Sequence, residues 1–323
     1  MRIGLALPHY DFSLPGGGPI AFARVAEVAG RAERLGFDSV WMSDHFFASL
    51  ERYGGDDVPQ GSLEPLTTLA ALAPMTERVR LGTLVLSAGF RHPAILAKSA
   101  TAIDLFSGGR LDLGIGAGWY APEFEAFGYP FGTTGERFGV LEETLEVLTR
   151  LFEEGPASYE GRRFALHDAF NHPLPAQRPR PPIWLGGKGG PRLLSLAARF
   201  ADGWNTAWRW TPDAYGHRVT AARHACEEIG RDPATIRRTI QAPLFMTDDD
   251  AFRQRVIGGM SAATGRTPEE AARSLLIGSV EEIKAKVQEY VDAGVQEFML
   301  ALWPRFHRDS LLRFSEEVIP AFR

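Results

Sequence analysis

The chain has 323 residues, of which 45% are hydrophobic, and its formal net charge is -5. No stretch gathers Lys and Arg into a basic stripe, so we expect no nucleic-acid partner. No apolar run reaches the roughly 18 residues of a membrane span, and Met1 leads directly into the strand-like "RIGLALPHY". We therefore expect a cytoplasmic protein without a membrane partner. The single cysteine, Cys226, excludes both an intramolecular disulfide and a cysteine-based zinc site, and we expect no metal.

Short apolar runs alternate with amphipathic stretches along the whole chain. The eight runs typical of strands are residues 2–8, 39–43, 79–87, 111–118, 181–187, 202–208, 239–247 and 296–302. A helical pattern follows each of them, and the last one covers about 308–322. Eight near-continuous apolar strands, each followed by a helix, favour a closed (β/α)8 TIM barrel over an open doubly wound sheet. We expect one α/β domain over residues 1–323.

Three connections in this pattern are too long to be simple turns: residues 44–62, 119–134 and 248–277. Each follows the C-terminal end of a strand, and barrels of this kind build their sites on that face. Residues 248–277 also carry helical patterns, which predicts an insertion that covers the mouth of the barrel. The proline-containing stretch 155–180 comes before the fifth strand, and we expect a small hairpin there.

The second predicted strand ends in "SDHF", which places Asp44 and His45 at the mouth of the barrel. An imidazole titrates near neutral pH and can give or take a proton beside a reacting atom. The adjacent carboxylate can orient a ring or accept a hydrogen bond from a cofactor. The alternative is structural, with Asp44 capping the loop and His45 packing in a partly buried position.

The fourth strand ends in "GIGAGWY", where Gly114, Gly116 and Gly118 would let a planar ligand approach the backbone. These glycines would equally serve to pack the tapering barrel. Because Trp119 stands where a Rossmann fingerprint has its last glycine, and because the fold is wrong for one, we exclude a dinucleotide site.

The fifth strand ends in "LGGKGGPRLL", with Pro191 positioned to begin a helix. A glycine-rich turn into a helix N-terminus offers free backbone N–H groups to a phosphate. Lys188 adds a positive charge, but no Ser or Thr follows it, so this is not a Walker loop. The alternative is a tight strand-to-helix turn without a ligand.

Taken together, these motifs closely resemble the luciferase-like monooxygenase superfamily. The resemblance covers nearly the whole chain and rests on "SDHF", "RLGTLVLSAGFRHPAILAKSATAIDLFSGGRLDLGIGAGWYAPEFEAFGYPF", "GERF" and "PPIWLGGKGGPRLLSLAARFADGWN". Within the superfamily, the chain is similar to the branch that uses the deazaflavin coenzyme F420. The resemblance implies a (β/α)8 barrel with an insertion after the seventh strand, and a homodimer.

The resemblance also implies roles for individual residues. Asp44 matches an acid that contacts the cofactor, and His45 matches a histidine that handles protons. The strand segment Thr83, Leu84 and Val85 matches the support of one face of the deazaflavin ring, with a non-prolyl cis peptide at Leu84–Val85. Ala117 and Gly118 match contacts to the cofactor tail. The expected phosphate-side turn consists of Gly187, Lys188, Gly189, Gly190 and Pro191.

The chain departs from the sugar-phosphate dehydrogenases of this branch. They carry a catalytic glutamate where this chain has Trp119, and a tryptophan soon after the histidine, where it has "HFFAS". A small, apolar organic substrate therefore fits better than a sugar phosphate. The expected substrate contacts are Phe47, Trp119 and Trp208.

Three hypotheses about function follow. The first is an F420-dependent oxidoreductase that moves hydride between the deazaflavin and an organic substrate. The second is an FMN-dependent monooxygenase on the same barrel, which consumes oxygen and works with a separate flavin reductase. The third is a non-catalytic flavin-binding protein, which would bind cofactor without turnover. "SDHF" favours the first.

Overall fold

The structure is a computed structural model that describes residues 1–13, 18–49, 58–207, 210–302 and 308–323. Parallel strands pair in chain order around a ring, and the last of them returns to the first, where Leu5 lies opposite both Leu300 and Val40. The predicted closed (β/α)8 barrel is therefore confirmed. Its strands are β1 (Arg2–Ala6), β2 (Ser39–Met42), β5 (Arg80–Thr83), β7 (Leu111–Gly116), β10 (Ile183–Gly186), β11 (Gly203–Ala207), β12 (Arg237–Met246) and β14 (Glu297–Ala301).

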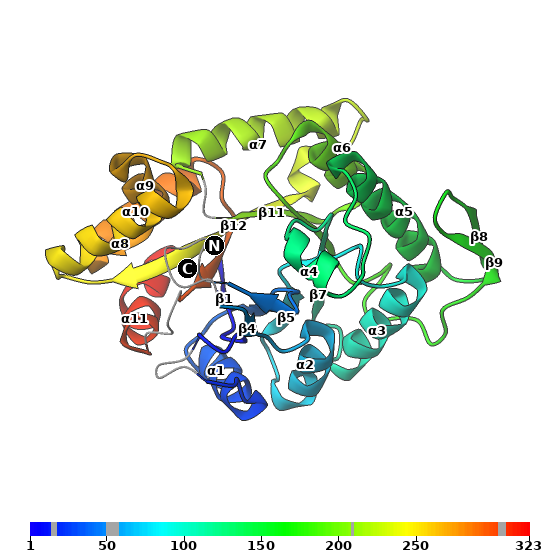
Figure 1. Cartoon of the computed structure of the whole chain (residues 1–323), viewed down its shortest axis with the longest axis horizontal. Coiled ribbons are helices and arrows are strands. Elements are labelled where there is room, and N and C mark those ends of the chain that lie inside the picture. Colours follow the sequence, from blue (N-terminus) through cyan, green and yellow to red (C-terminus); the bar gives the residue numbers. More distant parts are fainter. Residues whose placement is uncertain (14–17, 50–57, 208–209, 303–307) are drawn as a thin grey trace.

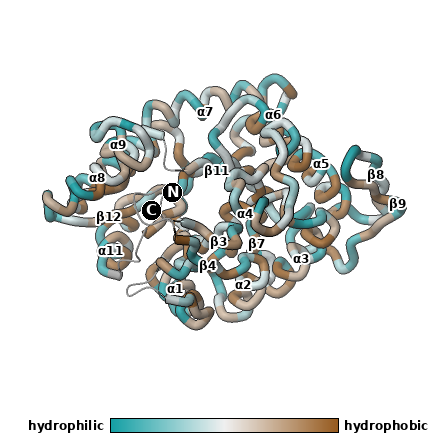
Figure 2. Tube along the Cα trace, in the orientation of Figure 1, coloured by the Kyte–Doolittle hydropathy of each residue, from teal (hydrophilic) through white to brown (hydrophobic). Residues whose placement is uncertain are grey.

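Helices surround the strands (Figure 1). In Figure 2, hydrophilic and hydrophobic residues alternate along these outer helices, as expected when a helix buries one face. None of the helices in the described part of the chain combines the length and apolarity needed to cross a bilayer. The outer helices are α1 (Phe22–Arg34), α2 (Pro65–Leu72), α3 (Pro93–Phe106), α5 (Thr134–Phe152), α6 (Pro191–Phe200), α7 (Pro212–Glu227), α10 (Val280–Asp292) and α11 (Arg308–Arg313).

Local sequence signals set where several helices begin. α2, α3, α6 and α7 each start with a proline, whose fixed φ suits the first turn and whose missing N–H is not needed there. Thr133 and Glu136 form a capping box at the start of α5, and Ser279 and Glu282 form another at α10. These signals fix where each of these helices begins along the chain.

The inside of the barrel is filled by two tryptophans. The rings of Trp41 and Trp184 meet edge to face with centroids 5.5 Å apart, and Leu84 and Met299 pack with them. A Cβ atom at Gly82 would lie 2.1 Å from the Trp41 ring, and one at Gly203 would lie 2.1 Å from the Trp184 ring. These two glycines therefore make room for the large rings that close the barrel below its mouth.

The long connections contain elements of their own. α4 (Ala121–Ala126) follows β7, and the insertion after β12 holds α8 (Asp250–Thr264), α9 (Pro268–Ser274) and β13 (Leu276–Gly278), which pairs with β12. The predicted hairpin before the fifth strand is confirmed as an antiparallel pair (Figure 1). The other small strands are β3 (Phe47–Ala48), β4 (Gln60–Gly61), β6 (Leu86–Ser87), β8 (Ala157–Glu160) and β9 (Ala165–Ala169).

Two predicted elements differ from the structure. The strand expected over 79–87 is divided into β5 and β6, with a cis peptide between Leu84 and Val85 at the division. The helix expected over 308–322 continues after α11 as a π-helical turn, Phe314–Val318, and a 3-10 turn, Ile319–Phe322. Two further 3-10 turns are Ala73–Met75 and Pro233–Thr235.

A buried acid lies at the first residue of β14, on the face of the barrel opposite the mouth. Glu297 is 1% exposed; it accepts a hydrogen bond from Ser39 at 3.0 Å, and Arg237 lies 3.6 Å from its second oxygen. Burial raises the pKa of Glu297 to about 7, and the nearby Asp112 adds to the rise. Between the ordinary pKa of a glutamate and about pH 7, Glu297 therefore stays protonated in the native state but is ionised in the unfolded chain.

This raised pKa predicts the pH dependence of stability. Between the ordinary pKa of a glutamate and about 7, the native state binds more protons than the unfolded state, so the free energy of unfolding falls as pH rises. Glu297→Gln removes this fall. In urea denaturation, the free energy of unfolding of the variant relative to the wild type should rise by up to about 1.4 kcal/mol per pH unit in that window. An equal difference between the two proteins at about pH 5 and about pH 8 would contradict this.

Candidate active site

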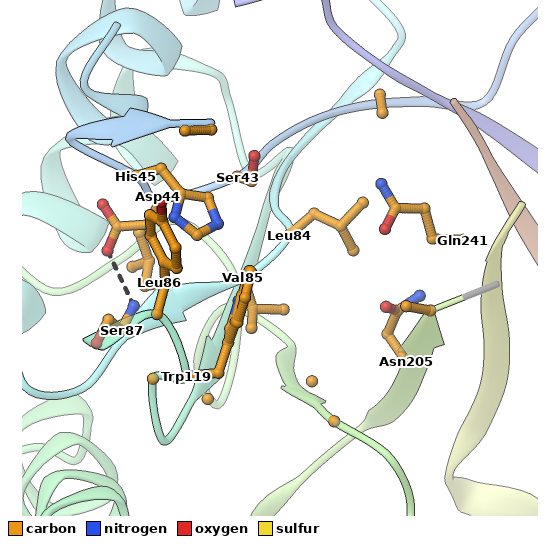
Figure 3. Close-up of a pocket in the computed structure, with 18 of the residues that line it drawn as sticks. Ser43, Asp44, His45, Leu84, Val85, Leu86, Ser87, Trp119, Asn205 and Gln241 are labelled. Atoms are coloured by element: carbon orange, nitrogen blue, oxygen red, sulfur yellow. Dashed lines mark hydrogen bonds between the residues drawn. The ribbon is translucent and has the colours of Figure 1, made fainter. Parts of the chain in front are cut away.

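A cavity of about 1030 Å³ opens at the C-terminal ends of the strands. Its walls combine residues from the ends of β1, β2, β7 and β10 with residues from β12, α4, α5 and α8. Figure 3 shows Ser43 and His45 on one side of it, Asn205 and Gln241 on the other, and Leu84 projecting between them. The cavity lies at the mouth, where the sequence predicted the site.

Asp44 joins the end of β2 to the segment after the cis peptide. Its carboxylate accepts two hydrogen bonds from Arg91, at 2.6 and 2.8 Å. It also accepts one from the Ser87 backbone N–H at 2.9 Å (Figure 3). Glu64 also contacts Arg91, at 2.6 Å. Since a carboxylate has about four lone-pair positions, the protein itself uses most of them. The geometry is that of an anchor, and it does not favour Asp44 as a proton carrier.

The imidazole of His45 is held by a buried carboxylate. Its Nδ1 lies 2.7 Å from Glu123, whose side chain is 1% exposed. The other oxygen of Glu123 accepts hydrogen bonds from the backbone N–H groups of Phe46 and Phe47. A carboxylate at Nδ1 favours the tautomer with the proton on that nitrogen. Nε2 is then left to exchange a proton with a ligand in the cavity.

A second histidine lies on the same wall. His9 is 3% exposed; its Nδ1 lies 2.7 Å from the Leu7 carbonyl oxygen, and its Nε2 lies 2.9 Å from the Ser43 hydroxyl. Burial lowers the pKa of His9 to about 4, and the nearby His45 opposes its protonation further. The hydroxyl of Tyr10 lies 2.6 Å from the same Ser43 oxygen. His9 is therefore neutral at pH values near neutrality.

Glycines around the cavity make room for the side chain of Val85. A Cβ at Gly186 would lie 2.5 Å from Val85, and one at Gly116 would lie 3.0 Å from it. A Cβ at Gly114 would lie 1.9 Å from the backbone oxygen of Thr83. The packing alternative for "GIGAG" thus accounts for Gly114 and Gly116 within the protein itself.

Gly118 has a positive φ of 77°, and its surroundings are crowded. A Cβ there would lie 2.7 Å from the Ser87 hydroxyl and 2.8 Å from the Phe124 ring. Its carbonyl oxygen accepts a hydrogen bond from Arg137 on α5 at 3.2 Å. Gly118 does line the cavity, but contacts within the protein already require a glycine.

The turn after β10 leads directly into α6. Gly190 is the N-cap of this helix, and a Cβ built on it would meet no heavy atom among the described residues within 4 Å. Gly189, with φ 70°, packs its backbone against Trp204. Lys188 is exposed and lines the cavity together with Gly187 and Gly190. This end of the cavity therefore offers an open helix N-terminus next to a cation.

The structure brings most of the predicted site residues together. Thr83 is buried and exchanges hydrogen bonds with the backbone of Gly114, so it does not line the cavity. Phe47, Gly189 and Pro191 also lie outside the lining, and Trp208 falls outside the described residues. The predicted residues that line the cavity are Asp44, His45, Leu84, Val85, Ala117, Gly118, Trp119, Gly187, Lys188 and Gly190.

The partners of His45 and Asp44 were not predicted from the sequence. Glu123 holds His45, and Arg91 holds Asp44, yet neither lies at a strand end. His9, Tyr10 and Ser43 were not predicted as site residues either. The available signals were the position of His9, just after the first strand, and that of Ser43, at the end of the second predicted strand.

The crowding at Gly118 predicts a difference between two glycines. Gly118→Leu should lower the free energy of unfolding more than Gly128→Leu, by about 1–3 kcal/mol, because it overpacks a filled region. Gly128 is a matched control: its φ is 72°, but a Cβ there would meet no heavy atom of the described residues within 4 Å. Denaturant titration of both variants measures the difference, and equal losses would refute the packing explanation.

The chain is similar to known proteins over most of its length. A family model described as luciferase-like monooxygenase matches residues 1–263. A curated relative from Kineococcus radiotolerans, named F420-dependent glucose-6-phosphate dehydrogenase, is 31% identical and is aligned over 93% of each chain.

Solved structures of similar fold include enzymes that work with different cofactors. An F420-dependent secondary alcohol dehydrogenase in complex with an F420-acetone adduct matches with a TM-score of 0.82 at 22% identity, over 100% of this chain and 99% of the other. The oxygenating constituent of 3,6-diketocamphane monooxygenase from Pseudomonas putida, in complex with FMN, matches with a TM-score of 0.76 at 20% identity. This match covers 99% of this chain and 98% of the other. With the family model covering most of its length, the chain belongs to the luciferase-like monooxygenase family.

Proposed function

We propose that this protein is an F420-dependent oxidoreductase that transfers hydride between the deazaflavin and an uncharged organic substrate, with His45 as the residue that moves the proton. The observation that carries the proposal is the hydrogen bond between Glu123 and His45 at the end of β2, 2.7 Å long and buried on the carboxylate side. It fixes an imidazole at the edge of a cavity large enough for a cofactor and a substrate.

The cofactor assignment rests on the relatives and on the fit of the cavity. Six of the curated relatives, including the one from Kineococcus radiotolerans, are named for F420 dependence. In this chain, Leu84 and Val85 present an apolar surface for a ring, and the open backbone at Gly190 accepts a bulky neighbour. Lys188 and Arg137 supply positive charge for an anionic tail.

In the proposed reaction, some residues of the site exchange or hold a proton and others only position them. When bound, a deazaflavin supplies a carbon centre that takes up or gives hydride and, unlike a flavin, does not use oxygen. Glu123 keeps a proton on Nδ1 of His45, so that Nε2 takes the proton from a substrate hydroxyl and returns it in the reverse direction. Asp44 and Arg91 hold the end of β2 against Ser87, which positions His45 without moving a proton.

The walls favour a substrate without a charge and with a mainly apolar body. The charged side chains among the described lining residues are the anchored Asp44 and Glu123 and the cations Arg137 and Lys188, which we assign to the cofactor tail. The remaining wall is rich in aromatic and aliphatic side chains. These include Trp119, Tyr120, Trp210, Pro243, Phe245, Met260, Ala301 and Leu302.

An FMN-dependent monooxygenase is the alternative on the same barrel, and FMN-bound neighbours of similar fold exist. The two functions differ in their need for oxygen and for a separate reductase. Turnover of alcohols or ketones with F420 in the absence of oxygen supports the oxidoreductase, whereas product formation that needs reduced FMN and oxygen contradicts it. Homodimer formation and a cytoplasmic location remain predictions from the sequence.

His45→Ala should lower the rate of hydride transfer by about 10²–10⁴-fold, because the reacting oxygen loses its proton partner. The affinity for F420 should stay nearly unchanged. Anaerobic assays that follow the absorbance of the deazaflavin give the rate, and a binding titration gives the affinity. His167→Ala is the control, since this histidine is exposed on β9, and it should retain full activity.

Glu123→Gln tests whether the rate depends on the tautomer of His45 and not only on the presence of its imidazole. The amide keeps the size of the side chain, but its NH₂ group facing Nδ1 would favour the tautomer with the proton on Nε2. The rate should fall towards that of His45→Ala, and the pH profile should change, while the affinity for F420 holds. An unchanged rate and pH profile would remove Glu123 from the mechanism.

A further inference from the structure

A chain of hydrogen bonds runs along the cavity wall beside His45. The Tyr10 hydroxyl lies 2.6 Å from the Ser43 oxygen, which lies 2.9 Å from Nε2 of His9; Nδ1 of His9 lies 2.7 Å from the Leu7 carbonyl oxygen. Tyr10, Ser43 and His9 all line the cavity. Figure 3 places Ser43 between His45 and Leu84. The proton transfer proposed for His45 does not use this chain.

The direction of every hydrogen bond in the chain follows from its inner end. A carbonyl oxygen only accepts, so the proton of His9 must be on Nδ1, where it is donated to Leu7. Because His9 is buried and neutral, its Nε2 is a bare acceptor, and Ser43 must donate to it. A serine hydroxyl has one hydrogen, so Tyr10 must in turn donate to Ser43.

With these directions fixed, the Ser43 hydroxyl can form only one further kind of hydrogen bond. Its hydrogen is used by His9, and one of its two lone pairs is used by Tyr10. Within the described residues the second lone pair has no partner, and Ser43 is part of the cavity lining. The hydroxyl can therefore accept a hydrogen bond from a ligand, but it has no hydrogen to give.

We propose that Ser43 is a specificity-determining residue that selects a hydrogen-bond donor, and that His9 is the positioning residue that imposes this choice. In the proposed function, on which this inference rests, the donor is the hydroxyl group of an alcohol substrate. Its single hydrogen points to Ser43 while the alcohol is bound, and it turns to Nε2 of His45 when the proton leaves. Oxidation removes a hydride from the carbon and a proton from the oxygen of that alcohol. The resulting ketone has no hydrogen for Ser43, so the wall holds the product less tightly than the substrate.

Cyclohexanol and cyclohexanone form a matched pair of probes that differ in this respect. Calorimetry measures cyclohexanol binding to the protein loaded with reduced F420 and cyclohexanone binding to the protein loaded with oxidised F420, so that neither probe reacts. The wild type should prefer the alcohol by about tenfold, the size of one neutral hydrogen bond. The same preference for the alcohol should hold without cofactor, because residues of the protein determine it.

Three variants separate selection from general damage to the site. Ser43→Ala should weaken cyclohexanol binding by about tenfold and leave cyclohexanone binding unchanged. His9→Phe should free the hydrogen of Ser43, strengthen cyclohexanone binding and bring the ratio of the two dissociation constants towards one. Tyr10→Phe is the matched control and should keep the preference, since His9 still holds the Ser43 hydrogen. F420 affinity should stay the same in all three.

Several outcomes would overturn the inference. Equal affinity for the two probes in the wild type, no measurable binding of the alcohol, or an unchanged ratio in Ser43→Ala would each do so. Loss of F420 affinity in Ser43→Ala would mean that Ser43 serves the cofactor instead of a substrate. Failure of the proposed function shows separately, as a wild type that does not take up F420; the titrations without cofactor then still decide the role of Ser43.

Discussion

The contact between Glu123 and His45 is the interaction on which the whole site depends. It joins α4, in the connection after β7, to the tip of β2, and the same carboxylate also receives backbone N–H groups of Phe46 and Phe47. A buried carboxylate needs such partners, because an unpaired charge away from water is costly. The requirement to satisfy Glu123 therefore fixes the loop after β2, and with it the direction of the imidazole.

The barrel supports this arrangement from below and from the side. Trp41 and Trp184 fill the interior under the mouth, and Leu84 extends from this packed layer into the cavity. Beside them, Val85 occupies the space left by Gly116 and Gly186. A rigid floor and an anchored β2 tip allow a small number of polar groups to act on a ligand with defined geometry. The residues proposed to exchange a proton lie on one wall, while on the other side of the cavity Asn205 and Gln241 stand among apolar side chains.

Sequence patterns predicted the fold better than the contacts within the site. Hydrophobic runs identified the eight barrel strands because parallel strands are buried on both faces. Strand ends likewise located His45 and Asp44. Their partners Glu123 and Arg91 escaped prediction because they lie on a short helix and on a loop, where no periodicity specifies which way a side chain points. Gly118 was expected to make room for a cofactor, whereas Ser87 and Phe124 already require its small size.

Titration of the purified protein with F420 and, separately, with FMN decides which cofactor the cavity binds. Trp119 lines the cavity, so tryptophan fluorescence should report a planar ligand that enters it. We expect tight, saturable binding of F420 and much weaker binding of FMN. Tight binding of FMN with none of F420 would contradict this, and would assign this site to oxygen chemistry with a partner reductase.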